Sequence, residues 1–396
     1  MLLTVNSTKV SALLSIITTI TPAPELLHSP VRNILLSTST PLYLKKFSKM
    51  IFMPIRYSVS RNKFHVSRIP GGKMGDFYVP ISIESIETNI FPDVALYLKS
   101  GNNFVLYKSH GRDFSRNDSE RLMENNVEFL YVSPGDQDII NEFMESNAER
   151  MLKDSNIQNK TKGKIIYQTS VNFVGDIFDN PNKVGDFERS KRLIENLLLY
   201  LSNDKQALSS LESVMAHNYF TFVHSLQVTA LSLLLHSEAY LLLRDELVDV
   251  GIGTLLHDFG KIFVAPAILD KTGKLTEIEL TELNRHPEAG YKFLKEKTSL
   301  NDVSLSIVRY HHERNNGNGF PLGLKGASIP RSAQVGAICD LYCTLTIDRT
   351  CRKSLPSHFA IHIMKQEMKG AFNMRLLDIL EKLVCTGDTS TALLYG

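Results

Sequence analysis

The feature that most constrains the fold is a helical pattern of apolar residues in the C-terminal half of the chain. The pattern starts after the segment DNPNKVGD, 179–186, and continues almost unbroken to about residue 385. No run in this half has the alternation of apolar and polar residues that would indicate a strand. A series of helices without strands buries its apolar faces by packing helix on helix. The sequence therefore predicts an all-α bundle over 191–396.

A different pattern precedes the bundle and predicts a small α+β domain over 74–134. The segments VALYLKS and NFVLYKS flank a Gly-Asn-Asn turn, as the strands of a hairpin do, and EFLYVS is a further strand. Between them, NDSERLMENN places Asn117 three residues before Glu120, which resembles a capping box at a helix start. No cluster in this domain suggests catalysis. We therefore expect it to sense a signal or to bind a partner protein.

The segment between these two regions, 135–190, is expected to form connecting helices. From 136 to 154 the apolar residues are spaced for one face of a helix. Polar residues then dominate NIQNKTKGK, 156–164, and Pro and Gly interrupt the pattern at 179–186. The fold class is thus mainly α, with a domain boundary near these two breaks.

The segment 1–73 is a basic extension, since it holds ten Lys or Arg and a single acid, Glu25. Two interpretations stay open. The extension is either a targeting or membrane-associating segment, a signal peptide included, or sequence upstream of a true start at Met74. The apolar run at 10–20 is shorter than the roughly 20 residues that span a bilayer. No other long apolar run is present, so we expect a soluble, cytoplasmic protein. The four cysteines lack zinc-type pairing and suit free thiols in a reducing compartment: Cys339, Cys343, Cys351 and Cys385.

Chemistry is concentrated in histidines and aspartates spread along the predicted bundle. They lie in five short segments that begin at positions 224, 257, 286, 311 and 340. The spacing between successive segments suits one return from helix to helix. Seven imidazole and carboxylate groups can then converge at one level of the bundle: His224, His257, Asp258, His286, His311, His312 and Asp340. A single histidine on an apolar helix is more often a core residue. Adjacent pairs such as His257 and Asp258 are harder to explain as ordinary core residues, because a buried carboxylate needs a cation or hydrogen bonds.

The composition of this set favours a metal centre of a particular kind. Mixed His and Asp ligands without thiolates favour iron, manganese or zinc-like ions over calcium or copper(I). Seven ligands are too many for one structural zinc ion. Two ions are the natural number.

Four motifs in order resemble the HD-GYP family of bacterial cyclic di-GMP phosphodiesterases, which belongs to the HD phosphohydrolases. They are HD-x-GK at 257–261, HPxxG at 286–290, HHExxxGxGFP at 311–321 and DxYxxLTxDRxxR at 340–352. The resemblance covers about 215–385. It implies a helical bundle with iron or manganese that hydrolyses cyclic di-GMP to pGpG, and in a further cut to GMP, with a hydroxide bridging two ions.

The resemblance also implies roles for individual residues. Asp258 would bridge the two ions, Lys261 would lie near the scissile phosphate, and Arg349 and Arg352 would hold phosphate. All seven candidate ligands match family positions: His224, His257, Asp258, His286, His311, His312 and Asp340. The loop NNGNGFP would form one wall of the nucleotide pocket, where its glycines permit positive φ and close approach of a ligand.

Four positions depart from the family pattern, and one of them is Asn316, which stands where a loop aspartate is common. Phe320 replaces the family tyrosine, which keeps a ring for packing against a base but loses the hydroxyl. Cys343 stands where an aspartate is usual. Phe220 stands where members with a third ion have a glutamate, so we expect two ions.

Two alternatives to a cyclic di-GMP phosphodiesterase remain. The chain could be a weakly active or inactive cyclic di-GMP receptor that signals through the N-terminal domain. It could also be an HD phosphohydrolase acting on another cyclic dinucleotide. Nucleic-acid binding is not expected, because the basic surplus lies within 1–73 rather than in a stripe with interleaved aromatics. A homodimer is one oligomeric state that the sequence permits.

Overall fold

A computed structural model describes the chain from residue 78 to residue 386, apart from short gaps. The gaps are 84–85, 87, 89–90, 102, 156, 204–205, 216–220, 270, 272 and 348–353. All described residues belong to one compact unit. The predicted extension 1–73 and Met74 lie outside the described residues.

The first part of the described chain is an α+β domain built on a four-stranded antiparallel sheet. Its strands are β1 (Val79–Ser82), β2 (Leu96–Ser100), β3 (Asn103–Lys108) and β4 (Phe129–Val132), in the spatial order β1-β4-β2-β3. The predicted hairpin between β2 and β3 is confirmed, and Gly101 in its turn has φ +61°. Positive φ at this position suits glycine, which has no Cβ to clash.

The N-cap of helix α4 (Arg116–Glu124) lies two residues before the predicted N-cap. Ser115 is the N-cap: its side-chain oxygen accepts from the Asp118 N–H at 3.2 Å. The Asp118 carboxylate in turn accepts from the Ser115 N–H at 3.0 Å. The predicted pair of Asn117 and Glu120 is therefore wrong, although the predicted type of motif is present.

Three helices follow the sheet: α5 (Gln137–Lys153), α6 (Asn159–Asp179) and α7 (Phe187–Asn203). Helix α5 matches the predicted helix at 136–154, and its Ile140 and Met144 share a core with the sheet residues Ile81 and Leu130. The polar segment 156–164 is not a long break, because α6 begins inside it. Arg189 of α7 pairs with both Glu145 of α5 and Asp176 of α6.

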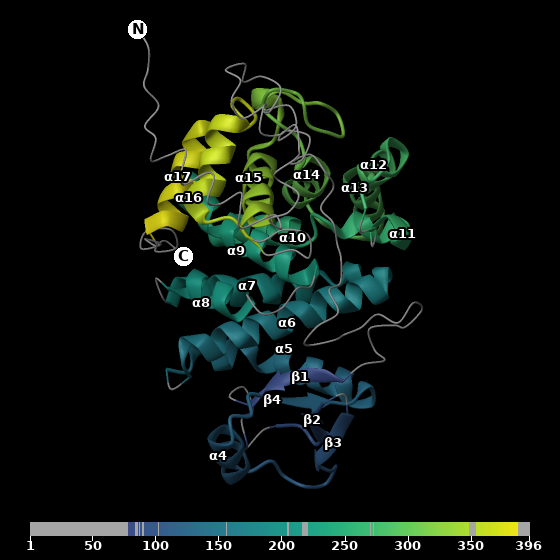
Figure 1. Cartoon of the computed structure of the whole chain (residues 1–396), viewed down its shortest axis with the longest axis vertical. Helices are drawn as coiled ribbons and strands as arrows, with labels where there is room; N and C mark the ends of the chain where they lie inside the picture. Colours follow the sequence, from purple (N-terminus) through teal and green to yellow (C-terminus); the bar gives the residue numbers. More distant parts are fainter. Residues whose placement is uncertain are drawn as a thin grey trace, which may run out of the picture. The chain divides into compact units, whose positions relative to one another are not determined.

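The rest of the described chain is helical, as predicted (Figure 1). From 159 onward, the only β pairing among the described residues is an isolated bridge between Asn316 and Lys325. The elements are α8 (Ala207–Met215), α9 (Thr221–Tyr240), α10 (Arg244–Leu255), η5 (Phe259–Phe263), α11 (Pro266–Leu269), α12 (Glu277–Leu283), α13 (His286–Lys297), α14 (Asp302–Tyr310), η6 (Gly326–Ser328), α15 (Arg331–Thr346), α16 (Ser357–His362), the π-helical η7 (Ile363–Glu367) and α17 (Met374–Thr386).

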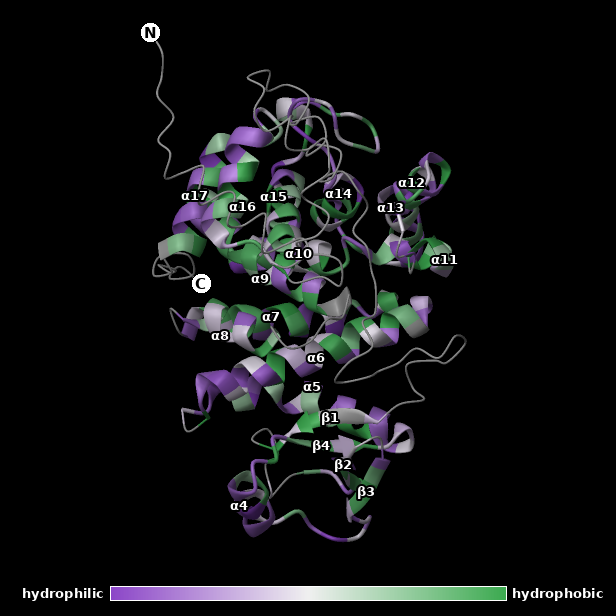
Figure 2. Cartoon of the chain, in the orientation of Figure 1, coloured by the Kyte–Doolittle hydropathy of each residue, from purple (hydrophilic) through white to green (hydrophobic). Residues whose placement is uncertain are grey.

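Helix α9 lies at the centre of the bundle, where it packs against α10, α15 and α17. Figure 2 shows both hydrophobic and hydrophilic residues along α7 and mainly hydrophilic residues on α4. Helix α14 packs against α10, α13 and α15. These contacts bring the C-terminal ends of α10 and α14, the start of α13 and the middle of α15 into one neighbourhood.

Two further predictions concern the thiols and the membrane. Cys339, Cys343 and Cys385 form no disulfide bond with one another, as predicted, and Cys351 lies outside the described residues. Among the helices that the structure describes, none combines the length and the apolar character of a membrane-spanning segment.

Candidate metal centre

The bundle brings all seven candidate ligands together. They form two groups whose candidate ligand atoms lie within 4.8 Å of one another: Asp258, His286, His311 and His312 in one group, and His224, His257 and Asp340 in the other. Six of the seven are buried and His312 is partly buried. The predicted convergence is therefore confirmed, while the role of these side chains as metal ligands remains a prediction.

Each ligand is placed by a helix end or by a buried helical face. His257 and Asp258 follow the C-terminus of α10, and His311 and His312 follow the C-terminus of α14. His286 is the first residue of α13, and Asp340 lies in the middle of α15. Residues at helix ends can leave the helical direction, so their side chains reach a common centre from several sides.

Backbone carbonyls fix the orientation of three of the imidazoles. Nδ1 of His257 lies 2.7 Å from the Thr254 carbonyl, and Nδ1 of His286 lies 2.8 Å from the Leu283 carbonyl. Nδ1 of His311 lies 2.9 Å from the carbonyl oxygen of residue 308. A carbonyl only accepts, so each Nδ1 must carry the proton and each Nε2 presents a lone pair to the centre. Histidines that bind metals are commonly oriented in this way.

The lone pairs on the Nε2 atoms face other hydrogen-bond acceptors. Whether the site fits a cation can be judged from this arrangement. Nε2 of His286 lies 3.3 Å from Nε2 of His311. Nε2 of His257 has no hydrogen-bond partner among the described residues, although it lies 3.4 Å from Oδ2 of Asp258. Acceptors that face one another in a buried site repel unless a proton or a metal ion lies between them. The donor set therefore fits divalent cations.

Asp258 joins the two groups through its two carboxylate oxygens. Oδ1 faces His286 at 3.3 Å and His311 at 3.9 Å, whereas Oδ2 faces His257 at 3.4 Å. Asp340 lies on the other side, with Oδ1 at 3.0 Å from Nε2 of His224 and Oδ2 at 3.8 Å from Nδ1 of His312. A carboxylate with one oxygen toward each group can bridge two ions.

The protonation states of Asp258, Asp340, His311 and His312 also suit cation binding, whereas Asp258 and Asp340 outweigh burial and raise the pKa of His257. Burial raises the pKa of Asp258, but Lys261 and His257 outweigh this and hold that pKa well below its ordinary value. The pKa of Asp340 is likewise held low against burial, chiefly by His224. Burial, with the neighbouring imidazoles, lowers the pKa values of His311 and His312 well below 6.5. Ionised carboxylates and neutral imidazoles are the forms that bind metal ions.

Lys261 is the one cationic side chain that pairs directly with the candidate ligands among the described residues. It lies in η5, is only 4% exposed, and its ammonium group donates a short hydrogen bond to Oδ2 of Asp258. This places a fixed positive charge at the junction of the two groups. The position agrees with the role that the family resemblance implies, near a bound phosphate.

Two glycines of the motifs bring Asp258 and His286 together. A Cβ on Gly260 would lie 1.9 Å from the carbonyl oxygen of His286, and a Cβ on Gly290 would lie 3.0 Å from the Gly260 nitrogen. The backbones of η5 and α13 therefore touch at a point where no side chain fits. This contact explains why HD-x-GK and HPxxG each contain a glycine.

The loop after His312 has the positive φ that was predicted, but its close approach is of another kind. Gly317 has φ +79°. A Cβ on Gly319 would lie 2.5 Å from backbone atoms of 312–314, so this glycine admits the chain's own backbone rather than a ligand. Phe320 stacks on His312 with ring centroids 4.6 Å apart. The loop thus places an aromatic ring beside the metal centre.

Two residues of this loop escaped the sequence analysis. Glu313 is 1% exposed, and its carboxylate accepts hydrogen bonds from the N–H groups of Leu322 at 2.7 Å and Leu324 at 2.9 Å. Arg314 is buried, lies over the Phe372 ring at 4.9 Å, and donates to the carbonyl of Glu313 at 2.9 Å. Burial lowers the pKa of Arg314 to about 10. The signal for Glu313 was its place directly after two histidines and before a Gly-rich loop.

Three predicted positions cannot be placed. Arg349 and Arg352, predicted to hold phosphate, lie outside the described residues. Phe220, on which the expectation of two rather than three ions rests, also lies outside them.

Comparison with known proteins agrees with the geometry. The family model of the HD domain matches residues 204–376, a range that contains all seven candidate ligands. These residues are therefore similar to the HD domain, and the motifs within them resemble those of the HD-GYP family. The resemblance found in the sequence is therefore confirmed.

Several curated relatives are similar to part of this chain. The chain is 34% identical over 200 residues to a cyclic di-GMP phosphodiesterase of Pseudomonas aeruginosa, a match that covers 50% of this chain and 48% of the relative. It is 33% identical to a cyclic di-GMP phosphodiesterase response regulator of Xanthomonas campestris, over 35% of this chain and 36% of the relative. It is 32% identical to a 3'3'-cGAMP-specific phosphodiesterase of Vibrio cholerae, over 42% and 38%. The matches thus span about half or less of these relatives.

A solved structure extends the similarity in fold beyond residues 204–376. An HDG"Y"P protein from Bdellovibrio bacteriovorus superimposes with a TM-score of 0.59 at 19% identity. The match covers 78% of this chain and all of the other chain. At this identity the likeness establishes the fold alone.

Proposed function

We propose that the chain is a metal-dependent phosphodiesterase that hydrolyses cyclic di-GMP to pGpG, and in a second cut to GMP. The observation that carries the proposal is the meeting of two buried His/Asp groups at Asp258, beside the ammonium group of Lys261. The names of the relatives point to the same substrate class. No protein nucleophile is needed for this reaction, and none of the candidate ligands has to act as one.

The site would hold two divalent ions, iron or manganese. Asp258, His286, His311 and His312 would hold one ion, and the other would be held by His224, His257 and Asp340. Asp258 would reach both ions through its two oxygens. Bound ions would lower the pKa of a water molecule and neutralise charge on the phosphate oxygens.

The chain's own residues would orient the phosphodiester and stabilise its charge. Lys261 would present its ammonium group to the scissile phosphate, where charge grows in the transition state. Phe320 would stack on a guanine, since its ring already lies stacked on His312 at the edge of the site. Arg349 and Arg352 would hold the second phosphate through their planar guanidinium groups.

A second candidate activity, hydrolysis of a hybrid cyclic dinucleotide, is favoured by the relatives that are named 3'3'-cGAMP-specific phosphodiesterases. The receptor alternative is favoured by Phe320, which lacks the tyrosine hydroxyl of the family. One assay distinguishes the cyclic di-GMP phosphodiesterase, the hybrid-dinucleotide phosphodiesterase and the receptor. Chain loaded with iron or manganese is incubated with cyclic di-GMP or 3'3'-cGAMP, and the linear products are measured by chromatography.

We expect the loaded chain to hydrolyse cyclic di-GMP faster than 3'3'-cGAMP. The variant Phe320→Tyr restores the family hydroxyl without changing the ring, so it should keep or raise the rate. Faster cleavage of 3'3'-cGAMP would replace the proposed substrate. A chain that holds two ions and binds cyclic di-GMP tightly, but cuts neither nucleotide even with Tyr at position 320, would be a receptor.

We propose that the α+β domain at 74–134 senses a signal or binds a partner protein and is joined to the HD-GYP domain, 191–396, by the helices of 135–190. A cytoplasmic location and a homodimer remain predictions as well.

A further inference from the structure

A cavity of about 780 Å³ lies in the HD-GYP domain apart from the candidate metal centre. None of the seven candidate ligands lines it, nor does Lys261. Its walls come from the end of α9, the loop after the metal-site histidines, and the first residues of α15 and α17. The side chains that matter for its chemistry are Tyr240, Asn315, Arg331, Gln334, Asn373 and Arg375.

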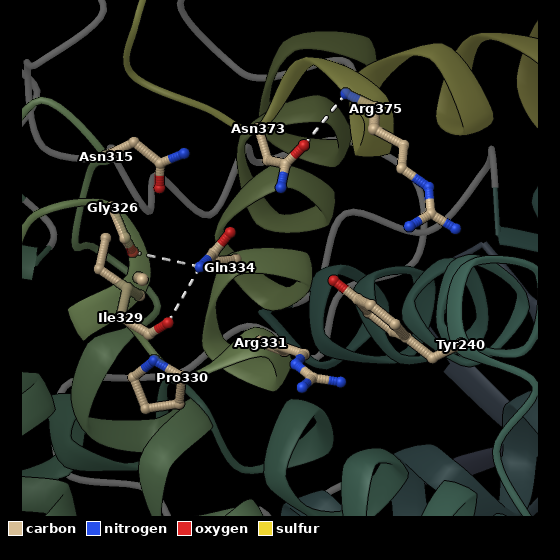
Figure 3. Close-up of a pocket in the computed structure, with 10 residues that line it drawn as sticks. Tyr240, Asn315, Gly326, Ile329, Pro330, Arg331, Gln334, Asn373 and Arg375 are labelled. Carbon is tan, nitrogen blue, oxygen red and sulfur yellow. Dashed lines mark hydrogen bonds between the residues drawn. The ribbon is translucent and has the colours of Figure 1, made fainter.

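Two cations at this cavity have no carboxylate partner among the residues that the structure describes. Arg375 donates through Nη2 to the Ala239 carbonyl at 3.3 Å, and the Arg331 guanidinium lies 5.8 Å from the centre of the Tyr240 ring. In Figure 3 the two guanidinium groups lie on opposite sides of the Tyr240 ring. Both arginines also lower the pKa of Tyr240, against the larger effect of burial. The cavity therefore carries two positive charges that its own residues leave uncompensated.

The opposite wall is neutral and already ordered. The Gln334 amide donates to the carbonyls of Gly326 at 3.3 Å and Ile329 at 2.9 Å, and Oδ1 of Asn373 accepts from the Arg375 N–H at 3.0 Å (Figure 3). These bonds hold the amides in place before any ligand arrives. A wall of fixed amides and an aromatic ring suits the base and ribose of a nucleotide, and it offers no carboxylate to repel an anion.

We propose that this cavity binds a nucleotide with a terminal phosphate monoester. The monoester carries close to two negative charges at neutral pH, which matches two guanidinium groups and the N-terminal ends of α15 and α17. The volume lies within the range typical of small-molecule sites, and it is larger than an inorganic phosphate needs. Arg331 and Arg375 bind the phosphate, and the ring of Tyr240 contacts the base.

The cavity is connected to the candidate metal centre through one loop. The N–H of Asn315 donates to the Ala371 carbonyl at 2.8 Å, and the Asn315 carbonyl accepts from the Gly326 N–H at 3.1 Å. Asn315 follows His312 by three residues and precedes Phe320 by five. A ligand that joins this loop to α17 therefore stabilises the segment that carries Phe320.

The test measures binding of GMP to the full-length, metal-loaded chain by calorimetry. Arg331→Gln and Arg375→Gln should each weaken GMP binding by about tenfold or more, because each removes a charge-assisted hydrogen bond. Lys369→Gln removes an exposed cation that does not line the cavity, so it should leave the affinity unchanged. Guanosine should not bind measurably, and inorganic phosphate should bind at least tenfold more weakly than GMP.

A second readout locates the site, because GMP can also bind at the metal centre. Hydrogen exchange should show slower exchange of the amides at 326–334 and 373–376 when GMP is added, and this effect should disappear in the arginine variants. Unchanged GMP affinity in a variant that carries both Arg331→Gln and Arg375→Gln would overturn the proposal. Slower amide exchange confined to the residues around His311 and His312 would also overturn it. Equal affinity for inorganic phosphate and GMP would overturn the nucleotide assignment. None of these readouts depends on hydrolysis.

Discussion

Gly260 lies against the carbonyl oxygen of His286, so that a Cβ at residue 260 would come within 1.9 Å of that oxygen. Two motifs that are separate in the sequence, at 257–261 and 286–290, meet at this point, and their meeting sets the 3.3 Å distance between Asp258 and His286. The obstacle is backbone, which cannot rotate away as a flexible side chain can. The geometry of the candidate metal centre therefore depends on a residue that binds nothing.

The first prediction follows from this contact. Gly260→Ala should push η5 away from α13, cost about 1–3 kcal/mol of stability or more, and reduce the number of ions bound. Thermal unfolding and elemental analysis measure both effects. Gly273→Ala is the matched control, because a Cβ at residue 273 meets nothing within 4 Å. If Gly260→Ala binds ions as well as the control does, the contact does not position the site.

The second prediction concerns Glu313. Glu313→Gln replaces one acceptor oxygen with an NH₂ group that faces a backbone N–H, so one of the two bonds to Leu322 and Leu324 is lost at a cost of about 1–3 kcal/mol. Exchange of the amides at 316–326 should become faster, and the KM for substrate should rise more than kcat falls. The control Glu296→Gln alters a carboxylate that is 72% exposed and pairs only with Lys297 among the described residues. If the amides at 316–326 exchange equally slowly in Glu313→Gln and Glu296→Gln, Glu313 does not hold this loop in place.

The third prediction concerns Lys261. Lys261→Ala should keep two ions and lower turnover by roughly 10²-fold, the scale of one lost electrostatic contact to a transition state. The same variant should be destabilised more after chelation than in the loaded state, because Asp258 then has neither ions nor Lys261 beside it. Lys292→Ala, on the exposed face of α13, serves as control. Normal turnover in Lys261→Ala would contradict a catalytic role.

The fourth prediction concerns the pH dependence of the α+β domain. Burial raises the pKa of Asp118, but hydrogen bonds from Ser115 and Tyr107 and the charge of Arg112 outweigh it and lower that pKa to about 2. A carboxyl group with a lowered pKa stabilises the fold above its unfolded pKa, here 3.8, and this stabilisation is lost as the pH falls toward 2. Because solvent screens the half-exposed Arg112, the contribution is about 1–2 kcal/mol at pH 7, and roughly half of it is lost by pH 3.

Asp118→Asn tests this relation. The stability difference between wild type and variant, measured by amide exchange in 115–132, should be large at pH 6 and clearly smaller at pH 3. A difference that stays constant between these pH values would show that the carboxylate charge contributes nothing.

Much of the fold could be predicted because it depends on local patterns. The apolar period predicted the helical half, and the Gly-Asn-Asn turn predicted the hairpin of β2 and β3. The cap of α4 was misplaced, because Ser115 and Asn117 are both good N-cap residues and only the Asp118 bonds distinguish them. The helix boundary inside 156–164 was missed because the first turns of α6 are polar in sequence, although two of these polar residues, Thr161 and Lys162, are buried.

The candidate site likewise has features that the sequence predicts and features that it does not. The spacing of the histidines and aspartates predicted their convergence, because each gap suits one helical return. The contact of Gly260 with Gly290, the bonds of Glu313 to Leu322 and Leu324, and the cavity beside Tyr240 were not predictable. Each depends on how separate segments pack in three dimensions, which no local period records.

The central claim is that Asp258 joins two groups of ligands into one centre that cleaves a phosphodiester only when both groups hold an ion. The most direct measurement is a titration of metal-stripped chain with manganese or iron, in which bound ions per chain and linear product from cyclic di-GMP are measured at each step. We predict little turnover up to one ion per chain and a steep rise as the second ion binds. Full turnover with one ion per chain, or two ions bound without any hydrolysis, would contradict the account.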